Sequence, residues 1–440
     1  MGKLESERAV SNARETRRLF GFVATRFDQI RFERVPDPRD PRGKRWALST
    51  LLFASLLGIM TGQKSFADVE RFTEQLPRSV RYRFGIRRRI PDTTLRNALG
   101  TIELQTLRPI LHSTMRSAIR SKSISVDFEL PFGIVSMDGK YVTVPTVDDR
   151  YSQRSTHGDS ETAIRGRIGT MTATLSSSLA RPCIDVYPVP AATNEMGVFA
   201  RALDALLDTY GNLDLFRLVT YDAGICSKAN AQHIRDRHLH YLLGLKGSQP
   251  DLLFWASLWL NQRAPESADA LSVDGKGKYE VRRTLFLASC PCGTDGWDHL
   301  RTVVRVDSDG FDRHGKPTHE TFYFLSSLSP DRLSPQQWLT VIRRHWAVET
   351  THQILDDAFD EDQRPWVTQN PRLTAVIMIL RRIGYTLLTI FKHVTERSES
   401  RQSEPWHVLL SRIRDAMLLA TDTIVAAARR RSAEPLPTLL

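Results

Sequence analysis

The feature that most constrains this chain is a change of pattern at Phe132, where short β-rich runs begin to alternate with amphipathic helices. Runs rich in Val, Ile, Leu and Tyr predict strands, and apolar residues at helical spacing predict helices. The expected strands are Phe132–Val144, Ile168–Ser176, Cys183–Val189, Phe216–Tyr221 and Tyr241–Leu245. Three strands, then helix, strand, helix and strand, predict a mixed α/β layer with crossover connections between the later strands.

The two helices of this layer have recognisable starts. Asn194 is placed to cap the first, Gly211 to end it, and Ser227 to cap the helix Lys228–His238. Asn and Ser side chains accept hydrogen bonds from the free N–H groups of a first helical turn, and glycine commonly follows the last turn. The buried side of the first helix is expected to consist of Met196, Phe199, Leu203, Leu206 and Tyr210.

The regions on either side of the α/β layer have different sequence patterns. Residues 1–130 are predicted to be helical, and residues 250–329 to be a β-rich insertion with a hairpin at Asp274-Gly275. That insertion also contains an apolar helix at Leu252–Leu260 and strands at Leu300–Val306 and Thr321–Leu328. Ser334-Pro335 is predicted to open one long helix that ends near Phe359.

Charge is distributed unevenly along the chain. The formal net charge is +11, and residues 1–130 hold 25 Lys and Arg against 14 Asp and Glu. The counts are 26 against 30 for residues 131–377, and 10 against 6 for the last 63 residues. Basic ends around a mildly acidic middle favour a polyanionic partner such as nucleic acid, although basic ends that are merely solvated surface would give the same counts.

A basic run in the first region is the most concrete candidate for nucleic-acid contact. Arg87, Arg88 and Arg89 lead into a short helix that starts near Pro91. A basic turn before a helix is compatible with helix-turn-helix binding of DNA and equally with a structural pair of helices.

The number of cysteines and the hydropathy of the chain indicate the cellular compartment of the protein. Four scattered cysteines predict no disulfide framework, and the pair Cys290 and Cys292 lacks the further ligands of a structural zinc site. The apolar stretches Trp46–Met60 and Leu373–Phe391 are interrupted by polar or charged residues and are interpreted as buried helices. The sequence therefore predicts a cytoplasmic protein without a membrane partner.

Three acids are candidates for catalytic residues because of their positions in the predicted elements. Asp138 lies in the first strand, and Asp222 ends the fourth, where ligands collect in open α/β sheets. On the long helix predicted after Ser334, Glu349 is the acid nearest the centre of a single stripe. The stripe consists of Trp338, Val341, Ile342, His345, Glu349, His352, Asp356 and Phe359.

The other polar residues of the stripe are interpreted as support. Burial of His345, His352 and Asp356 is costly unless they are paired, so a polar network around Glu349 is expected for them. Asp138, Asp222 and Glu349 offer only oxygen ligands, which suit Mg²⁺ or Mn²⁺. Two such ions can activate an attacking oxygen and stabilise a leaving oxygen in phosphoryl transfer.

At these residues the sequence resembles the DDE transposases of bacterial insertion sequences, in the H-repeat-associated branch with a ribonuclease H-like core. The resemblance rests on Met137-Asp138-Gly139-Lys140, on Val219-Thr220-Tyr221-Asp222-Ala223 and, most specifically, on Arg344-His345-Trp346-Ala347-Val348-Glu349. Further matches are Asp40-Pro41-Arg42-Gly43-Lys44 and Ile90-Pro91-Asp92-Thr93-Thr94-Leu95. The chain departs from the family at Ala192, Thr350 and Gln353, and none of these positions is one of the three acids.

The resemblance implies a domain plan and a set of partners. Residues 1–130 would be a basic, helical DNA-binding domain, 131–249 and 330–395 the catalytic core, 250–329 its β-rich insertion and 396–440 a basic C-terminal helix or tail. Asp138, Asp222 and Glu349 would hold two Mg²⁺ or Mn²⁺ ions. The enzyme would cut and join double-stranded DNA at insertion-sequence ends and in its target, as a homodimer that holds both ends.

Alternative functions remain open at this stage. The same fold can serve a host nuclease, or a DNA-binding protein descended from a transposase that has lost its chemistry. A loss of one of the three acids would favour the second alternative. A nucleophilic pair of Cys226 with a histidine has no identifiable orienting group.

Overall fold

The computed structural model describes residues 2–42, 44–124, 129–156, 164–272, 280–291, 293–312 and 314–433. Its centre is a mixed sheet in which strands run in the order β4-β3-β1-β5-β6. These strands are β1 (Ile134–Val144), β3 (Ile164–Leu175), β4 (Cys183–Val189), β5 (Leu218–Tyr221) and β6 (His240–Leu245). β1 is antiparallel to β3 and parallel to β5, which is parallel to β6. This arrangement confirms the predicted α/β, ribonuclease H-like fold.

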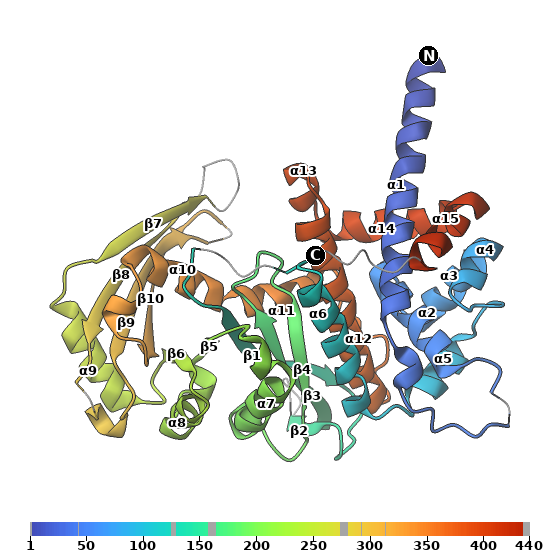
Figure 1. Ribbon diagram of the computed structural model, residues 1–440. Coiled ribbons are helices and arrows are strands. Elements are labelled where there is room, and N and C mark those ends of the chain that lie inside the picture. Colours follow the sequence, from blue (N-terminus) through green and yellow to red (C-terminus); the bar gives the residue numbers. More distant parts are fainter. Residues whose placement is uncertain are drawn as a thin grey trace.

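The insertion extends this sheet. β10 (Pro317–Ser326) pairs antiparallel with β6, and the sheet continues outward through three more antiparallel strands. These are β9 (Thr302–Phe311), β8 (Glu280–Ser289) and β7 (Ser267–Ser272), with α9 (Pro250–Asn261) packed against β8 and β9. Figure 1 shows them at one end of the molecule. The hairpin predicted at Asp274-Gly275 lies outside the described residues, between β7 and β8.

Both faces of the sheet are covered, because successive residues of a strand point to opposite sides. Ile134 belongs to the hydrophobic cluster that contains Trp338 and Ile342, on α10 (Pro335–His345). Its neighbour Val135 belongs to the cluster that contains Phe199 of α7 (Glu195–Tyr210). The remaining core helices are α8 (Lys228–Asp236), α11 (Ala347–Asp357) and α12 (Pro371–Ile390), and the short strand β2 (Gln153–Thr156) pairs with the start of β3.

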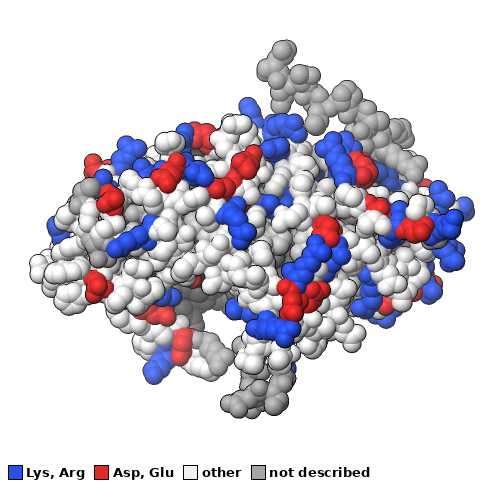
Figure 2. Space-filling model, turned by 90° about the horizontal axis from the view of Figure 1, so that it is seen from below, with Lys and Arg blue, Asp and Glu red and all other residues white. Residues whose placement is uncertain are grey.

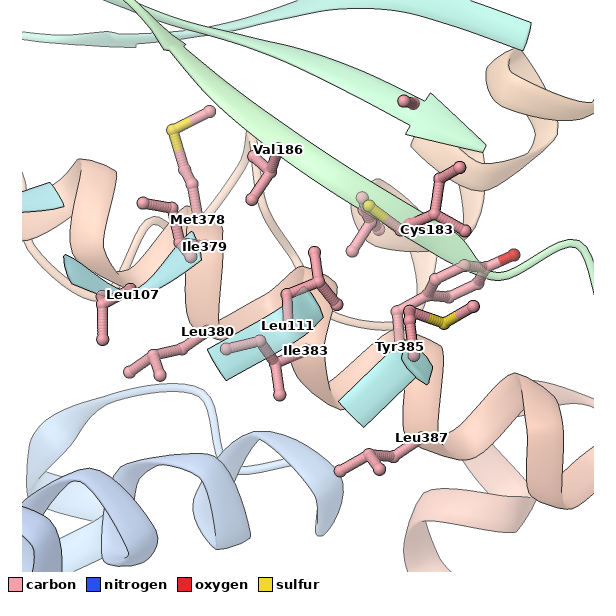
Figure 3. Packing of buried hydrophobic residues seen from close by; sticks show 14 of the residues in the cluster. Leu107, Leu111, Cys183, Val186, Met378, Ile379, Leu380, Ile383, Tyr385 and Leu387 are labelled. Carbon is pink, nitrogen blue, oxygen red and sulfur yellow. The ribbon is translucent and has the colours of Figure 1, made fainter. Parts of the chain in front are cut away.

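Helix α12 runs through the interior. All of its residues except Arg372 are buried, and it packs against β3, β4, α2 and α6. Figure 3 shows its Met378, Ile383 and Leu387 among side chains from α6 and β4. The segment Pro371–Thr395 is long and apolar enough to cross a membrane, yet its apolar window is wholly buried inside the fold. This packing agrees with the predicted buried helix.

Helices from both ends of the chain complete the molecule (Figure 1). The first group is α1 (Gly2–Gln29), α2 (Leu48–Met60), α3 (Phe66–Gln75), α4 (Arg78–Arg83), α5 (Asp92–Leu99) and α6 (Arg108–Arg120). The last group is α13 (Glu399–Gln402), α14 (Trp406–Leu419) and α15 (Asp422–Ala433). α1 packs against α14 and α15, so the two ends of the chain meet.

Some of the predictions for the core helices were correct and others were wrong. The side chains of Asn194 and Ser227 cap α7 and α8 as expected. Met196, however, is 45% exposed and does not belong to the buried side of α7. The single helix predicted from Ser334 to Phe359 was also wrong, because α10 ends at His345 and α11 begins at Ala347. The junction residue Trp346 packs against Phe322 instead, with ring centroids 5.3 Å apart.

Candidate active site

Two adjacent strands bring Asp138 and Asp222 to neighbouring positions. In the parallel pairing of β1 with β5, Ser136 lies opposite Thr220, two residues before each acid. The hydroxyl of Thr220 donates to Ser136 Oγ at 2.8 Å, which fixes that register. Asp222 follows the end of β5, where its side chain accepts a hydrogen bond from the Gly224 N–H at 2.8 Å. The two carboxylates are thus presented from the same region of the sheet.

The junction between α10 and α11 places Glu349. Ser136 Oγ also lies 3.1 Å from the carbonyl oxygen of Arg344, one residue before the end of α10. The chain then restarts as α11, and Glu349 falls in its first turn. Burial, followed by the charges of Asp138 and Asp222, raises the pKa of Glu349. The three acids therefore lie within electrostatic reach of one another.

The pKa values of the two strand acids, Asp138 and Asp222, are also raised. Burial raises the pKa of Asp138 to about 6, against the opposing effects of the Gly139 N–H and of Lys140. Burial and the charge of Asp138 raise the pKa of Asp222, whereas the Gly224 N–H and Lys246 lower it. Among the described residues, no Lys or Arg forms an ion pair with either acid or with Glu349. Lys140 and Lys246 therefore act on these acids only at a distance, without a direct ion pair in the described part of the chain.

His352 supports Asp138 directly. Its Nδ1 lies 3.1 Å from Asp138 Oδ2, and its side chain is 9% exposed. Burial, together with the charge of Arg382, lowers the pKa of His352 to about 3. The ring is therefore neutral, and its Nδ1–H can donate to the carboxylate of Asp138. The structure thus gives His352 a direct contact with a candidate acid.

Asp356 belongs to a paired network beside the acids. Lys140 Nζ lies 2.6 Å from Asp356 Oδ2 and 2.6 Å from Asp362 Oδ2. Behind them, Arg382 forms a fully buried ion pair with Glu361. Lys140 follows Asp138 by two residues, so Asp356 supports the strand that carries Asp138 through Lys140.

The structure places His345 away from the acids, on the other side of the helix junction. Its ring contacts those of Phe324 and Trp346, with centroids 5.7 and 6.0 Å away. Burial lowers its pKa to about 4. The predicted stripe divides because α10 packs on one hydrophobic cluster and the apolar residues of α11 on the other. Within the described residues His345 has no polar contact with the acids.

Glu195 is a fourth acid in this region that the sequence prediction did not include. Burial, followed by the charges of Asp138 and Asp222, raises its pKa to about 7. It is the first residue of α7, directly after the cap Asn194. The Asn-Glu pair at this helix start was noted within the family resemblance, but nothing in the local sequence indicated that this helix begins beside Asp138.

The basic run Arg87, Arg88 and Arg89 is exposed in the connection between α4 and α5. Arg88 stacks over the ring of Trp46 at 5.1 Å from its centroid. Arg89 Nε lies 3.3 Å from Glu70 Oε1. The three guanidinium groups are accessible, and two of them also contact the helical region around them.

The donor set fits a hard divalent cation. Within the described ranges, no three His, Cys, Asp or Glu side chains are arranged closely enough to hold a metal ion as they stand. The acids nevertheless supply only carboxylate oxygens, which Mg²⁺ and Mn²⁺ prefer. Their raised pKa values and lack of Lys or Arg partners mean that a bound cation would relieve their mutual repulsion.

Comparison with known proteins agrees with this geometry. The family model described as "Transposase DDE domain" matches residues 130–382, which include Asp138, Asp222 and Glu349. A second model, described as associated with that domain, matches residues 30–114.

Three similar proteins come from Escherichia coli. "H repeat-associated putative transposase YhhI" and "Putative protein YbfL", both of strain K12, are each 23% identical over 340 residues, covering 74% of this chain and 82% of theirs. "Putative transposase YncI" of strain O157:H7 is 23% identical over 346 residues, covering 74% and 79%. Because the Transposase DDE domain model spans more than half of the chain and the fold is ribonuclease H-like, the protein belongs to the DDE transposase family.

Proposed function

We propose that this protein cuts and joins DNA phosphodiester bonds at the ends of an insertion sequence, with Asp138, Asp222 and Glu349 as the ligands of two Mg²⁺ or Mn²⁺ ions. The observation that carries the proposal is the convergence of these three acids from the middle of one strand, the end of its neighbour and one helix start. None of them has a Lys or Arg ion-pair partner in the described part of the chain. The charge of Asp138 raises the pKa of Asp222, and the charges of both raise the pKa of Glu349.

Each side chain has a defined task in this mechanism. When bound, the divalent ions activate the attacking oxygen and stabilise the leaving oxygen of an in-line displacement. Asp138 and Asp222 would hold the ions from the sheet, and Glu349 from the first turn of α11. His352 orients the carboxylate of Asp138 through its Nδ1–H. Attack by water cleaves a strand, and attack by a 3′-hydroxyl joins two strands.

Double-stranded DNA is the proposed partner, and charge supports it. The first 130 residues carry an excess of Lys and Arg. Figure 2 shows basic side chains over the helical end of the molecule, at the right of that view, and also across the rest of the face. Arg87, Arg88 and Arg89 are proposed phosphate contacts on these helices. A homodimer is proposed because two element ends must be held together.

The decisive experiment uses DNA that carries the terminal inverted repeats bordering this reading frame. Asp222→Asn keeps the hydrogen bond from the Gly224 N–H but removes the charge. Cleavage and strand transfer with Mg²⁺ are expected to fall below detection, while the affinity for the same DNA changes little. The matched control is Asp251→Asn in the first turn of α9, for which full activity is expected.

Three results would contradict the proposal. Full strand transfer by Asp222→Asn would remove this acid from the chemistry. Cleavage by the unmodified protein without any joining would indicate a nuclease. Binding of the repeats without cleavage in either metal would indicate a DNA-binding protein that has lost its chemistry.

A further inference from the structure

The carboxylate of Glu195 occupies the space that a side chain at position 139 would fill. A Cβ atom built on Gly139 would lie 2.0 Å from both Cδ and Oε1 of Glu195. Atoms at that separation overlap, so glycine is required next to Asp138 for Glu195 to lie where it does. The close approach brings the acid against the backbone of β1.

A hydrogen bond fixes the other side of this carboxylate. Tyr221 Oη donates to Glu195 Oε2 at 3.3 Å. The Tyr221 ring is buried and packs edge-on against Phe199 of α7, with centroids 5.6 Å apart and planes at 89°. Tyr221 directly precedes Asp222, and Gly139 directly follows Asp138. Glu195 therefore contacts both strands at the residues adjacent to the two acids.

The charges around Glu195 are mostly of its own sign. After burial, the charges of Asp138 and Asp222 have the largest effects on the pKa of Glu195, and both raise it. The guanidinium of Arg167 also acts on it but lies over the ring of Tyr141, 3.8 Å from the centroid. No Lys, Arg or His of the described residues forms an ion pair with Glu195.

The fully buried acids among the described residues are paired, whereas Glu195 is half-buried. Asp185 contacts Arg108 at 2.6 Å and His112 at 2.8 Å, and Glu361 contacts Arg382. An acid that contributes only to stability is expected to have such a partner, because an uncompensated charge is costly to bury. Like Asp222 and Glu349, Glu195 forms no ion pair with Lys or Arg among the described residues, and its position links the two strand acids.

We propose that Glu195 is a fourth carboxylate of the metal centre and supplies an oxygen to the cation that Asp138 and Asp222 share. This assignment rests on the proposed function, and it adds an acid that the three-acid motif does not contain. Gly139 provides the room, Tyr221 orients Oε2, and Oε1 remains for the cation. Four carboxylates also balance the charge of two divalent cations.

The first test measures binding of Mn²⁺ alone to the full-length protein by calorimetry, without DNA. Glu195→Gln keeps the size of the side chain and an acceptor for Tyr221 but removes the charge. We expect its affinity for Mn²⁺ to fall about tenfold or more, the scale on which altered metal surroundings act. Asp251→Asn, which removes one charge at the start of another helix, should bind as the unmodified protein does.

The second test asks whether position 195 touches the metal. Glu195→Cys replaces a hard oxygen by a softer sulfur, which favours Mn²⁺ over Mg²⁺. Cleavage by this variant should be lost in Mg²⁺ and partly restored in Mn²⁺, which raises the ratio of the two rates above that of the unmodified protein. A purely structural role for Glu195 predicts an unchanged ratio.

A third variant separates charge from packing. Tyr221→Phe keeps the carboxylate and removes only the hydrogen bond, so its Mn²⁺ affinity should fall less than that of Glu195→Gln. An equal loss in both variants would overturn the proposal. So would an unchanged Mn²⁺ affinity in Glu195→Gln, and if Asp222→Asn were then inactive, the three-acid function would stand. Full activity of Asp222→Asn would instead overturn the proposed function itself.

Discussion

At the scale of single residues, the acids around the site differ in the partners that the fold provides. Asp356 and Asp362 share Lys140, and Glu361 has Arg382. Among the described residues, Asp138, Asp222 and Glu349 form no such ion pair with Lys or Arg, although burial raises the pKa of Asp138 to about 6. Neighbouring carboxylates without a paired cation are expected where a ligand supplies the missing charge. Pairing, more than burial, therefore distinguishes the proposed metal ligands from the acids that stabilise the fold.

The pH dependence of stability can be predicted for His345. Burial lowers its pKa from 6.5 to about 4 in the folded protein. The unfolded chain therefore binds a proton first as the pH falls, and the neutral histidine's contribution, complete above pH 6.5, is lost towards pH 4. Between pH 7.5 and pH 5.0 this loss is about 2 kcal/mol.

Replacement of that ring by an apolar one should remove this part of the pH dependence. In His345→Phe, the difference between the free energies of unfolding at pH 7.5 and pH 5.0 should shrink by about 2 kcal/mol. Denaturation by urea at the two pH values measures it, with exposed His407→Gln as the control. An equal pH dependence in His345→Phe and in the unmodified protein would show that His345 is not buried as a neutral ring.

At the scale of secondary-structure elements, the junction between α10 and α11 decides where the third acid lies. A continuous helix would carry one polar stripe from His345 to Asp356. The observed break turns His345 towards Phe324 and leaves Glu349 in the first turn of a new helix. An acid in that turn also meets the positive end of the helix dipole. The break thus positions Glu349 in a first helical turn, where the dipole opposes the rise in its pKa that burial, Asp138 and Asp222 cause.

The hydroxyl of Ser136 connects this junction to the sheet by a hydrogen bond to the Arg344 carbonyl, and Ser136→Ala tests the role of this bond. The substitution removes the contacts of Oγ with the Arg344 carbonyl, Ser176 and Thr220. Because the hydroxyls of Ser176 and Thr220 are buried, we expect the free energy of unfolding to fall by about 1–3 kcal/mol. Cleavage at a temperature where the variant is fully folded should also fall, since Glu349 follows the junction.

The matched control for this change is Ser257→Ala on α9, whose hydroxyl makes an exposed bond to the Phe254 carbonyl. Its stability and cleavage should match those of the unmodified protein. If Ser136→Ala were as stable and as active as Ser257→Ala, the hydrogen bond to the Arg344 carbonyl would have no role in placing α11.

At the scale of the whole molecule, helices from the two ends of the chain form one structure with the core. Leu19, Phe20 and Val23 of α1 belong to the same hydrophobic cluster as residues of α12 and α14. Ion pairs join α1 to α14, where Arg412 contacts Glu15 at 2.6 Å, and to the connection between α12 and α13, where Arg18 contacts Glu396 at 2.5 Å. The predicted division at residue 130 therefore does not correspond to a gap in the packing.

This shared packing predicts the behaviour of a fragment. Residues 1–130 expressed alone would expose the face of α1 that covers α14 and α15, together with the face of α2 that covers α12. We expect this fragment to aggregate or to lack a cooperative thermal transition, because so much apolar surface would face water. Circular dichroism during heating, with the full-length chain as the reference, measures it. A soluble fragment with a cooperative transition would show that these helices form an independent domain.

Much of the fold could be predicted from the sequence, because strands and helix starts are indicated by patterns of neighbouring residues. Runs rich in Val, Ile and Tyr placed β1 and β4, and the side chains of Asn194 and Ser227 marked the starts of α7 and α8. Such patterns depend on neighbours within a few residues, which the sequence itself records. Asp138, Asp222 and Glu349 were likewise identified from their places at a strand, a strand end and a helix, together with the family's motifs.

The tertiary structure alone decided which residues surround these acids. Whether His345 or His352 reaches Asp138 depended on a helix break that is set by Trp346 and by Ser136, 208 residues from Arg344. The position of Glu195 depended on α7 starting beside Gly139, a contact between two separate elements. The physical reason is that sheet register and helix packing bring distant residues together, and no local pattern encodes those pairings. The sequence thus determined most of the elements and pointed to three acids, and the packing determined which residues lie around them.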